Sequence, residues 1–368
     1  MVNQILLKKS LKHIIFYPFS LLYGLVIAIR NFLFDQGIIP STRFKIPIIS
    51  VGNLAVGGTG KTPHTEFILS ILKDERKSAV LSRGYKRSTK GFKLADEKSD
   101  SLIIGDEPFQ IFQKFPDVTV AVDEKRVHGV KKLQEIIPDL QLIVLDDAFQ
   151  HRFIQAGLSI LLTDYSNLYS RDLLLPAGTL REWKNGSKRA DIIVVTKCPD
   201  DFTPIGMRLI ETELKPETNQ LLFFSRYIYD ELLPVFPDLS SEEWTYNRLK
   251  ENDASVLLMT GIVSPHSIVN QLDKFTKNVE TLFFPDHHAF LPKDFDLMSK
   301  VYEKFPTDEK ILLVTQKDAS RLISNPDFPQ SLKSRTYTLP VRVEILHNQE
   351  NLFIQKIKNY VVENSRNR

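Results

Sequence analysis

The chain has 368 residues, of which 42% are hydrophobic and 25% are charged; this is ordinary globular composition, and the length allows two domains. With 48 basic and 45 acidic residues the net charge is +3, which excludes a broad positive field for nucleic acid. The single cysteine, Cys198, excludes an internal disulfide and fits a reducing compartment in which ATP is available.

The first 35 residues differ from the rest of the chain. A lysine-rich start leads into an uncharged run of sixteen residues at 14–29, IIFYPFSLLYGLVIAI. A spanning helix needs about 20 residues, and Pro18 and Gly24 lower the helix propensity of this run. Because no small-residue cleavage site follows, a signal peptide is not expected. The basic flank and the two tyrosines favour a membrane-embedded or interfacial helix over a buried core helix.

After Pro40, short β-branched runs alternate with helical stretches, a pattern typical of a parallel sheet covered by helices. The predicted strands of this first series lie at 47–51, 78–82, 118–122, 142–146, 158–162 and 192–196. A second series begins near 255–261 and includes 310–318. The segments 221–229 and 334–345 bracket it, and we predict that they link two α/β domains.

The stretch NLAVGGTGKT at 53–62 follows a predicted strand and precedes a predicted helix. It fits the phosphate-loop pattern G-x-x-x-x-G-K-[ST] except at Ala55, where the pattern has glycine. Backbone N–H groups of such a loop surround phosphate oxygens, Lys61 supplies a cation, and the Thr62 hydroxyl can bind Mg²⁺. The alternative is a simple glycine-rich turn. The predicted nucleotide-binding residues are Gly57, Gly58, Thr59, Gly60, Lys61 and Thr62.

An acidic pair, Asp146 and Asp147, ends the predicted strand of LQLIVLDDAFQHR. A carboxylate at this place can reach Mg²⁺ that bridges the β and γ phosphates of a nucleotide. Acids at strand ends also form turns, which is the structural alternative. In the same chain as the phosphate loop, the pair predicts a metal site.

Eight sequence blocks resemble those of one family in their order along the chain. They are SVGNLAVGGTGKTP, SRGYKR, GDEP, LDDAFQHR, LLPAGTLRE, VVTKCP, TGIVSP and FPDHHAF. The chain resembles tetraacyldisaccharide 4'-kinases, the lipid A 4'-kinases of Gram-negative bacteria, over nearly its whole length. The loop of that family does not require glycine where Ala55 stands.

The resemblance implies ATP-dependent phosphorylation of the 4'-hydroxyl of an acylated glucosamine disaccharide 1-phosphate lipid. The setting implied is the cytoplasmic face of the bacterial inner membrane, with no nucleic acid and no obligate protein partner. The implied fold is α/β: a P-loop NTPase-like parallel-sheet domain, a second, smaller α/β domain and an N-terminal membrane-associated helix. The expected units are the helix at 1–35, the kinase domain at 36–220, the smaller domain with linker segments at its ends at 221–345, and a C-terminal helix and tail at 346–368.

The resemblance also assigns roles to single residues. Asp106 and His287 correspond to a carboxylate and a histidine that act together at the acceptor hydroxyl, with Lys61 as the third catalytic residue. Glu182 resembles a further acid near the metal, beside Asp146 and Asp147. From the sequence alone, Asp106 can instead cap a helix that starts at GDEP.

Further polar residues of the same blocks are weaker substrate candidates. Arg83 and Arg181 can meet phosphate charge or lie solvated at the surface. Arg126 and His128, on a predicted helix, can face the acceptor sugar or its 1-phosphate. The substrate candidates are Arg83, Arg126, His128, Gln150, His151 and Arg181.

Two other functional classes are open to a chain with a phosphate loop. A membrane-associated P-loop NTPase switch acting on a protein partner should carry a base-recognition motif N-K-x-D, and the nearest strings, TKCPD and TQKD, do not fit it. A membrane-tethered module that only binds a nucleotide would need neither the acid pair nor the string DHH.

Overall fold

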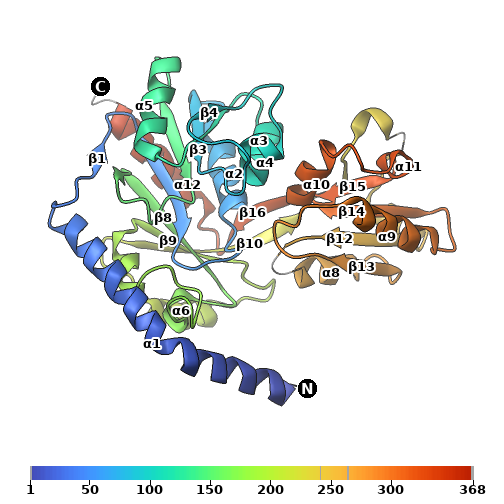
Figure 1. Ribbon diagram of the computed structural model, residues 1–368, viewed down its shortest axis with the longest axis horizontal. Helices are drawn as coiled ribbons and strands as arrows, with labels where there is room; N and C mark the ends of the chain where they lie inside the picture. Colours follow the sequence, from blue (N-terminus) through green and yellow to red (C-terminus); the bar gives the residue numbers. More distant parts are fainter. Residues whose placement is uncertain (1, 241, 263–264, 366–368) are drawn as a thin grey trace.

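The computed structural model describes residues 2–240, 242–262 and 265–365. Two sheets, each covered by helices, lie side by side, and the strands β10 (Leu221–Tyr229) and β16 (Val341–Ile345) run between them (Figure 1). This arrangement confirms the predicted α/β class with its parallel sheets. The side chains of the N-terminal lysines, and residues 263–264 of the block TGIVSP, lie outside the described residues.

The first sheet has the strand order β16-β10-β9-β8-β2-β6-β3-β5-β4, and its neighbours from β10 to β5 are parallel. Besides β10 and β16, its strands are β2 (Ile48–Asn53), β3 (Ser78–Ser82), β4 (Lys93–Leu94), β5 (Thr119–Val122), β6 (Leu142–Asp146), β8 (Leu158–Asp164) and β9 (Ile192–Thr196). The six predicted strands of the first series are confirmed to within two residues at each end. A separate pair joins β1 (Thr42–Arg43) to β7 (Ile154–Gln155).

Helices cover both faces of this sheet because successive strand side chains point to opposite sides. On one face lie α2 (Lys61–Leu72), α4 (Asp106–Lys114) and the C-terminal α12 (Glu350–Ser365), packed on one set of strand side chains. On the other lie α5 (Arg126–Ile136) and α6 (Pro204–Leu214). The shorter helices of this part are α3 (Ser101–Ile104), η1 (Tyr169–Arg171) and η2 (Lys184–Arg189).

The second sheet has the order β11-β15-β14-β12-β13. Its strands are β11 (Leu233–Pro234), β12 (Ser255–Thr260), β13 (Val279–Phe283), β14 (Lys310–Thr315) and β15 (Thr336–Leu339). One face packs on α7 (Tyr246–Glu251) and α8 (His266–Leu272), and the other on α9 (Pro292–Glu303), α10 (Gln316–Ile323) and α11 (Gln330–Lys333). A short turn, η3 (Pro237–Leu239), follows β11.

The two predicted linker segments form strands. Residues 221–224 of β10 pair with β9 in the first sheet, whereas residues 225–229 pair antiparallel with β16. Both crossings of the chain therefore lie in one two-stranded ribbon. The division at residues 220 and 345 stays a prediction, since both ribbon strands are hydrogen-bonded in the first sheet and also lead into the second.

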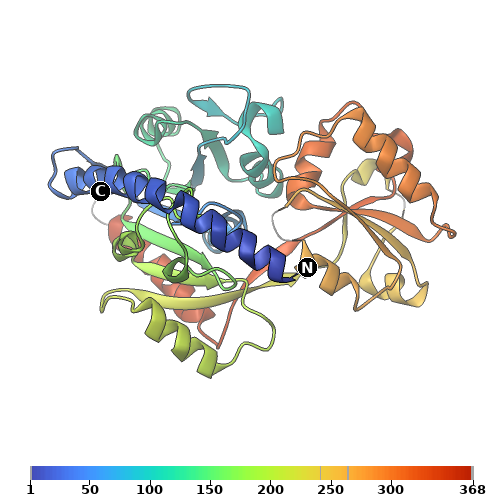
Figure 2. The same cartoon turned by 60° about the horizontal axis from the view of Figure 1, so that its bottom comes forward.

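One continuous helix, α1 (Val2–Asp35), forms the N-terminal segment and crosses the outside of the first domain (Figure 2). It is longer than the predicted apolar run and passes through Pro18 without ending. The part at Ile14–Asp35 has the length and composition to cross a membrane. Only 11% of its apolar window is buried, which argues against a buried core helix.

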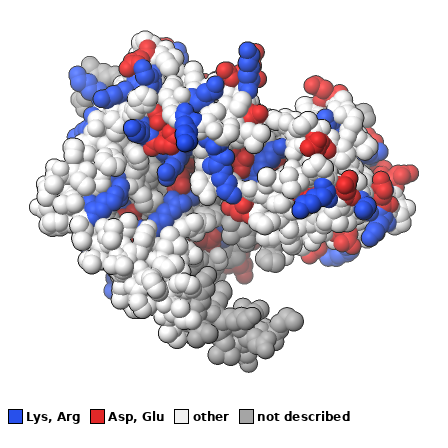
Figure 3. Space-filling view, viewed as in Figure 1, with Lys and Arg blue, Asp and Glu red and all other residues white. Residues whose placement is uncertain are grey.

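The inner side of α1 docks on the segment that precedes β9. Ser20 Oγ donates to the Leu174 carbonyl at 2.9 Å, and Trp183 Nε1 donates to the Gly24 carbonyl at 2.9 Å. A Cβ on Gly24 would lie 2.6 Å from the Trp183 ring, so glycine permits the close approach. The outer side is apolar and exposed, and Figure 3 shows the described part of α1 as a largely uncharged ridge.

Candidate active site

The phosphate loop connects β2 to α2 at the carboxyl end of the first sheet. Its entry is held by Ala55, which forms an antiparallel bridge with Leu180. The absence of the pattern glycine therefore affects only the entry of the loop. The part that would surround the phosphates is unchanged. Gly60, with a φ of 87°, is the N-cap of α2 and has the left-handed conformation that glycine adopts readily.

Neighbouring strands hold the carbonyl groups of the loop. Thr196 Oγ1 donates to the Thr59 carbonyl at 2.9 Å, and Lys197 Nζ donates to the Gly58 carbonyl. A Cβ on Gly60 would lie 2.3 Å from the Tyr227 hydroxyl of β10, so the loop packs tightly against the connecting strand. With these carbonyls engaged, the loop is a preformed anion site at the start of a helix.

The acidic pair lies directly beside the loop. Lys61 Nζ is 3.7 Å from Asp147 Oδ1, and Arg181 Nη1 is 3.0 Å from the same oxygen. Burial raises the pKa of Asp147, but the charges of Lys61 and Arg181 outweigh burial, so this pKa lies below its ordinary value.

Asp146 differs from its neighbour because it is fully buried. Burial, with Glu107 and Asp147 nearby, raises its pKa to about 7. Its Oδ1 accepts a hydrogen bond from Thr65, while Oδ2 is buried without a partner among the described residues. An unsatisfied buried carboxylate oxygen beside a phosphate loop is a fitting ligand for a hard cation.

Glu182 does not complete a carboxylate cluster with the acidic pair. Its carboxylate accepts from Arg189 at 2.8 Å and from Asn31 of α1 at 2.9 Å. In the described part of the chain, no group of three or more His, Cys, Asp or Glu side chains is placed to hold a metal ion. Glu182 therefore belongs to no preformed group of three ligands in the described residues, and its role as a further acid near the metal stays a prediction.

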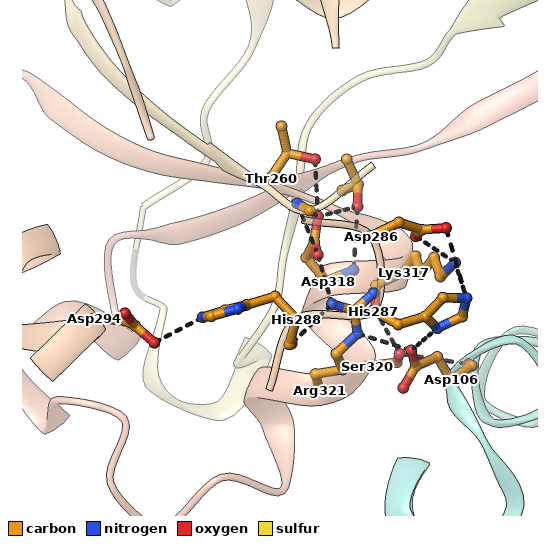
Figure 4. Close-up of polar contacts among 12 residues, drawn as sticks. Asp106, Thr260, Asp286, His287, His288, Asp294, Lys317, Asp318, Ser320 and Arg321 are labelled. Atoms are coloured by element: carbon orange, nitrogen blue, oxygen red, sulfur yellow. Dashed lines mark hydrogen bonds and ion pairs between the residues drawn. The ribbon is translucent and has the colours of Figure 1, made fainter. Parts of the chain in front are cut away.

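Asp106 and His287, 181 positions apart, lie in contact between the two sheets (Figure 4). His287 Nδ1 is 2.9 Å from Asp106 Oδ2. The capping alternative for Asp106 is wrong, since Gly105 is the N-cap of α4 and Asp106 is its first helical residue. His287 has a φ of 57°, a left-handed conformation that costs energy outside glycine and is often associated with a functional site.

Two cations from α10 complete this contact, and sequence reasoning missed both. Arg321 Nε donates to Asp106 Oδ2 at 2.9 Å, and Lys317 Nζ lies 3.1 Å from His287 Nε2. Burial raises the pKa of Asp106, but the hydrogen bond from His287 and the charge of Arg321 outweigh burial and hold the pKa below its ordinary value. The string TQKD contains Lys317 but resembles only a base-recognition motif, which it does not fit, and Arg321 lies outside this string.

The remaining substrate candidates differ in how far they can reach a ligand. Arg126 is buried and donates to the carbonyl groups of Asp146 and Asp147, and burial lowers its pKa to about 10. His128 Nδ1 contacts Asp123 at 2.6 Å. Arg83, in contrast, is exposed.

Gln150 and His151 follow the acidic pair along the chain. Gln150 Nε2 donates to the Asn53 carbonyl at 2.6 Å and to Glu182 at 3.2 Å. His151 is half-buried; burial and the charges of Arg126 and Arg30 lower its pKa to about 4. This end of the site therefore carries more positive than negative charge.

Comparison with known proteins identifies the family. Residues 12–361 match the family described as tetraacyldisaccharide-1-P 4'-kinase, LpxK. The chain belongs to this family. A tetraacyldisaccharide 4'-kinase of Bacteroides thetaiotaomicron is 48% identical over 95% of this chain and 94% of its own length. That of Flavobacterium johnsoniae is 42% identical over 95% and 97%, respectively.

A solved structure of the family has the same fold. The “apo” form of LpxK from Aquifex aeolicus in complex with ATP superimposes with a TM-score of 0.71 at 30% identity, covering 95% of this chain and 99% of that one. Membership of the 4'-kinase family confirms the resemblance found in the sequence. It also disfavours the switch acting on a protein partner.

Proposed function

We propose that this protein transfers the γ-phosphoryl group of ATP to the 4'-hydroxyl of a tetraacyldisaccharide 1-phosphate lipid in lipid A synthesis. The observation that carries the proposal is the contact of Asp106 with His287 at 2.9 Å, beside a phosphate loop. A nucleotide-binding module would need only the loop. A carboxylate paired with a histidine across two domains can act as a general base that removes a proton from an acceptor hydroxyl.

The loop would hold the phosphates of ATP. Backbone N–H groups of Gly57, Gly58 and Gly60 would face the phosphates at the start of α2, and that of Thr59, which donates to the Gly57 carbonyl at 2.9 Å, would have to exchange this partner for a phosphate oxygen. The Lys61 ammonium would offset charge that develops on the γ-phosphoryl group. Arg181, which pairs with Asp147 across the loop, would add a second cation.

The residues beside the loop fit a magnesium ion. The free Oδ2 of Asp146 and the hydroxyl of Thr62 would hold it, with Asp147 positioned by Lys61 and Arg181 at its side. When bound, Mg²⁺ neutralises charge on the β and γ phosphate oxygens. Glu182, which accepts from Gln150 and Asn31, would be a further acid near the metal.

Asp106 would act at the acceptor. Its carboxylate takes the proton of the 4'-hydroxyl as the hydroxyl oxygen bonds to the γ-phosphorus and the bond to the β-phosphate oxygen breaks, releasing ADP. Phosphoryl transfer has a loose transition state, so the proton leaves late, and such a base contributes about 10²–10⁴ in rate.

The lipid would reach the site from a membrane along α1. The outer side of α1 exposes Leu22, Val26 and Ile29, which follow each other at helical spacing. Tyr23 Oη, on its inner side, donates to the Arg181 carbonyl at 2.7 Å. The helix would thus place a membrane surface, on the ATP-containing cytoplasmic side, next to the phosphate loop. Exposed Arg83, whose charge acts on the nearby neutral His151, would face the anionic lipid.

The test is transfer of labelled γ-phosphate from ATP to a tetraacyldisaccharide 1-phosphate in detergent micelles. We expect a labelled lipid that requires both Mg²⁺ and the 4'-hydroxyl, and loss of labelling with Asp106→Asn. Lys304→Gln, an exposed lysine on the second domain, is the control and should keep full activity. Release of free phosphate without any labelled lipid would contradict the proposal. It would favour the alternative of an NTPase switch that acts on a protein partner.

A further inference from the structure

We propose that Lys317 is a positioning residue that keeps the proton of His287 on Nδ1 and thereby keeps Asp106 an anion aimed at the acceptor hydroxyl. The inference rests on the proposed role of Asp106. It starts from the cluster in Figure 4, where Lys317 approaches the imidazole from the side opposite to Asp106.

The two nitrogens of His287 have different partners. Nδ1 lies 2.9 Å from Asp106 Oδ2, and Nε2 lies 3.1 Å from Lys317 Nζ. The next polar group, Asp286 Oδ2, is 3.7 Å from Nε2, which is beyond hydrogen-bond distance. The edge of Tyr85 meets the ring with centroids 5.1 Å apart. Lys317 is therefore the closest polar partner of Nε2 among the described residues.

An ammonium group can only donate hydrogen bonds. Because Lys317 donates to Nε2, that nitrogen must present its lone pair, and the ring proton must lie on Nδ1. A doubly protonated imidazole would place an N–H and a positive charge against the ammonium at 3.1 Å. Lys317 thus selects one tautomer and opposes the imidazolium.

Lys317 stays charged because acids flank it on both sides. Its Nζ lies 3.2 Å from Glu107 of α4 and 3.0 Å from Asp286. Burial lowers the pKa of Lys317, but Glu107 and Asp286 outweigh burial and raise it above its ordinary value. Lys317 is therefore a charged donor to Nε2 at neutral pH.

The consequence falls on the carboxylate of Asp106. Its Oδ2 accepts from His287 Nδ1 and from Arg321 Nε, both at 2.9 Å. No described residue donates to Oδ1. A neutral donor on Nδ1 leaves the full negative charge on Asp106, and the two donors fix which oxygen is free for the acceptor hydroxyl. In the reverse tautomer, the lone pair of His287 Nδ1 would face a lone pair of Asp106 Oδ2. Their repulsion would turn the carboxylate, so that Oδ1 no longer faces the acceptor hydroxyl.

The structure also explains why the lysine sits in this place. Lys317 follows Thr315, whose side chain accepts from the Asp318 amide and caps α10. Asp318 is buried and holds Arg321 at 3.4 Å and the Gly261 amide at 3.1 Å. The start of α10 is therefore anchored to its own sheet, and it presents both cations to α4 from a fixed base.

The test compares Lys317→Met, which keeps the length of the side chain without a donor, with Lys317→Arg, which keeps a charged donor. The matched control is Lys304→Met. The full-length protein is labelled with ¹⁵N-histidine, and the His287 signals are assigned by their loss in His287→Gln. We expect Nε2 to be unprotonated at pH 7–8 in the unmodified protein, in Lys317→Arg and in the control. In Lys317→Met it should gain a proton.

Kinetics give a second readout. Lys317→Met should lower kcat about tenfold or more, as expected when a histidine loses its working tautomer, while KM for ATP stays within about twofold. A His287 whose Nε2 stays unprotonated in folded Lys317→Met would overturn the inference, as would an unchanged kcat. If the unmodified protein labels no lipid although the tautomer behaves as expected, the proposed function fails and the tautomer assignment stands.

Discussion

At the scale of single residues, the site consists of groups held in unusual states. Asp147 and His287 have positive φ angles, and Asp146 is a buried carboxylate with an unpartnered oxygen. Such states persist only where surrounding structure enforces them. The loop, the strand end after β6 and the contact with α10 supply that structure.

The first residue-scale prediction concerns Lys61. Lys61→Ala should lower kcat/KM for ATP by about two orders of magnitude or more, or about 3 kcal/mol, because the ammonium acts on charge that develops in transfer. Initial rates in the micelle assay measure it. Ala55→Gly, at the bridge to Leu180, should change the rate far less. Near-normal turnover of Lys61→Ala would remove the kinase proposal.

A second prediction tests Asp106 and His287 as a unit. Asp106→Asn should lower kcat by about 10²–10⁴ and His287→Ala by a comparable factor. Since the residues share one hydrogen bond, the double variant should lose less than the product of the single losses. ATP affinity, measured separately, should stay near normal. Fully multiplicative losses would mean that the two residues act independently.

A third prediction follows from His64 of α2. It is buried, with Nδ1 2.8 Å from the Gly60 carbonyl and Nε2 2.9 Å from Ser225 Oγ, and burial lowers its pKa to about 4. The unfolded chain binds the proton more tightly than the folded protein does. The contribution of His64 to stability is therefore full above about pH 6.5 and is lost as the pH falls toward 4.

The loss should approach about 3 kcal/mol below pH 4, from the ordinary pKa of 6.5 and the folded value of about 4. Urea unfolding between pH 4.5 and 7.5 measures it, and His64→Gln should show a flatter dependence over that window. Identical slopes for the two proteins would show that His64 is not the titrating group.

Local strings were enough to predict part of the site. The phosphate loop and the acid pair each lie in one stretch next to one strand, so their spacing shows the chemistry. Lys317 and Arg321 were missed because they lie on α10, which packs on the second sheet. Their contacts with the acids of α4 form only where the two helices meet. The contact of Glu182 with Asn31 was not predicted for the same reason, since Asn31 lies on α1.

At the scale of elements, α1 combines two unlike faces. Gly24 lets Trp183 approach the inner face, and Ser20 binds the Leu174 carbonyl. These contacts explain how one helix runs through the whole segment: Pro18 and Gly24 lower helix propensity, but docking and apolar surroundings compensate. The strands were easier to predict, because short β-branched runs are typical of parallel strands that are buried on both faces of a sheet.

The prediction for this element is that the outer face attaches the protein to lipid. Leu22→Ser, Val26→Ser and Ile29→Ser together should weaken binding to vesicles of anionic phospholipid, since these side chains are 63%, 58% and 52% exposed and each buried methylene contributes about 0.8 kcal/mol. ATP binding should not change. Sedimentation with vesicles measures the first, and equilibrium binding the second.

The matched control changes exposed apolar residues of another helix. Ile205→Ser and Leu209→Ser on α6 remove side chains that are 73% and 67% exposed and should leave vesicle binding unaltered. Equal loss in both variants, or none in the α1 variant, would contradict attachment through α1.

At the scale of the whole molecule, opposite charges hold the two domains together. The acids Asp106 and Glu107 start α4, and the cations Lys317 and Arg321 lie on α10. These ion pairs are partly buried, so salt screens them less than it screens surface pairs. The ribbon of β10 and β16 is the covalent link between the same two domains.

We predict that Arg321→Met broadens the distribution of distances between the domains. Spin labels at Lys73→Cys and Lys300→Cys report it, because both positions are exposed while Cys198 is buried and burial raises its pKa to about 12. Arg335→Met is the control, since Arg335 pairs with Glu242 inside the second domain. Equal distributions for the two variants would show that Arg321 does not hold the domains.

The close packing of Tyr227 on Gly60 has a mechanical consequence. Tyr227 lies in the half of β10 that pairs with β16, so the same strand touches the phosphate loop and carries the second domain. Tyr227 therefore connects the phosphate loop with the strand that leads into the second domain. Any displacement of the loop backbone at Gly60 toward Tyr227 would therefore meet the strand that leads into the second domain.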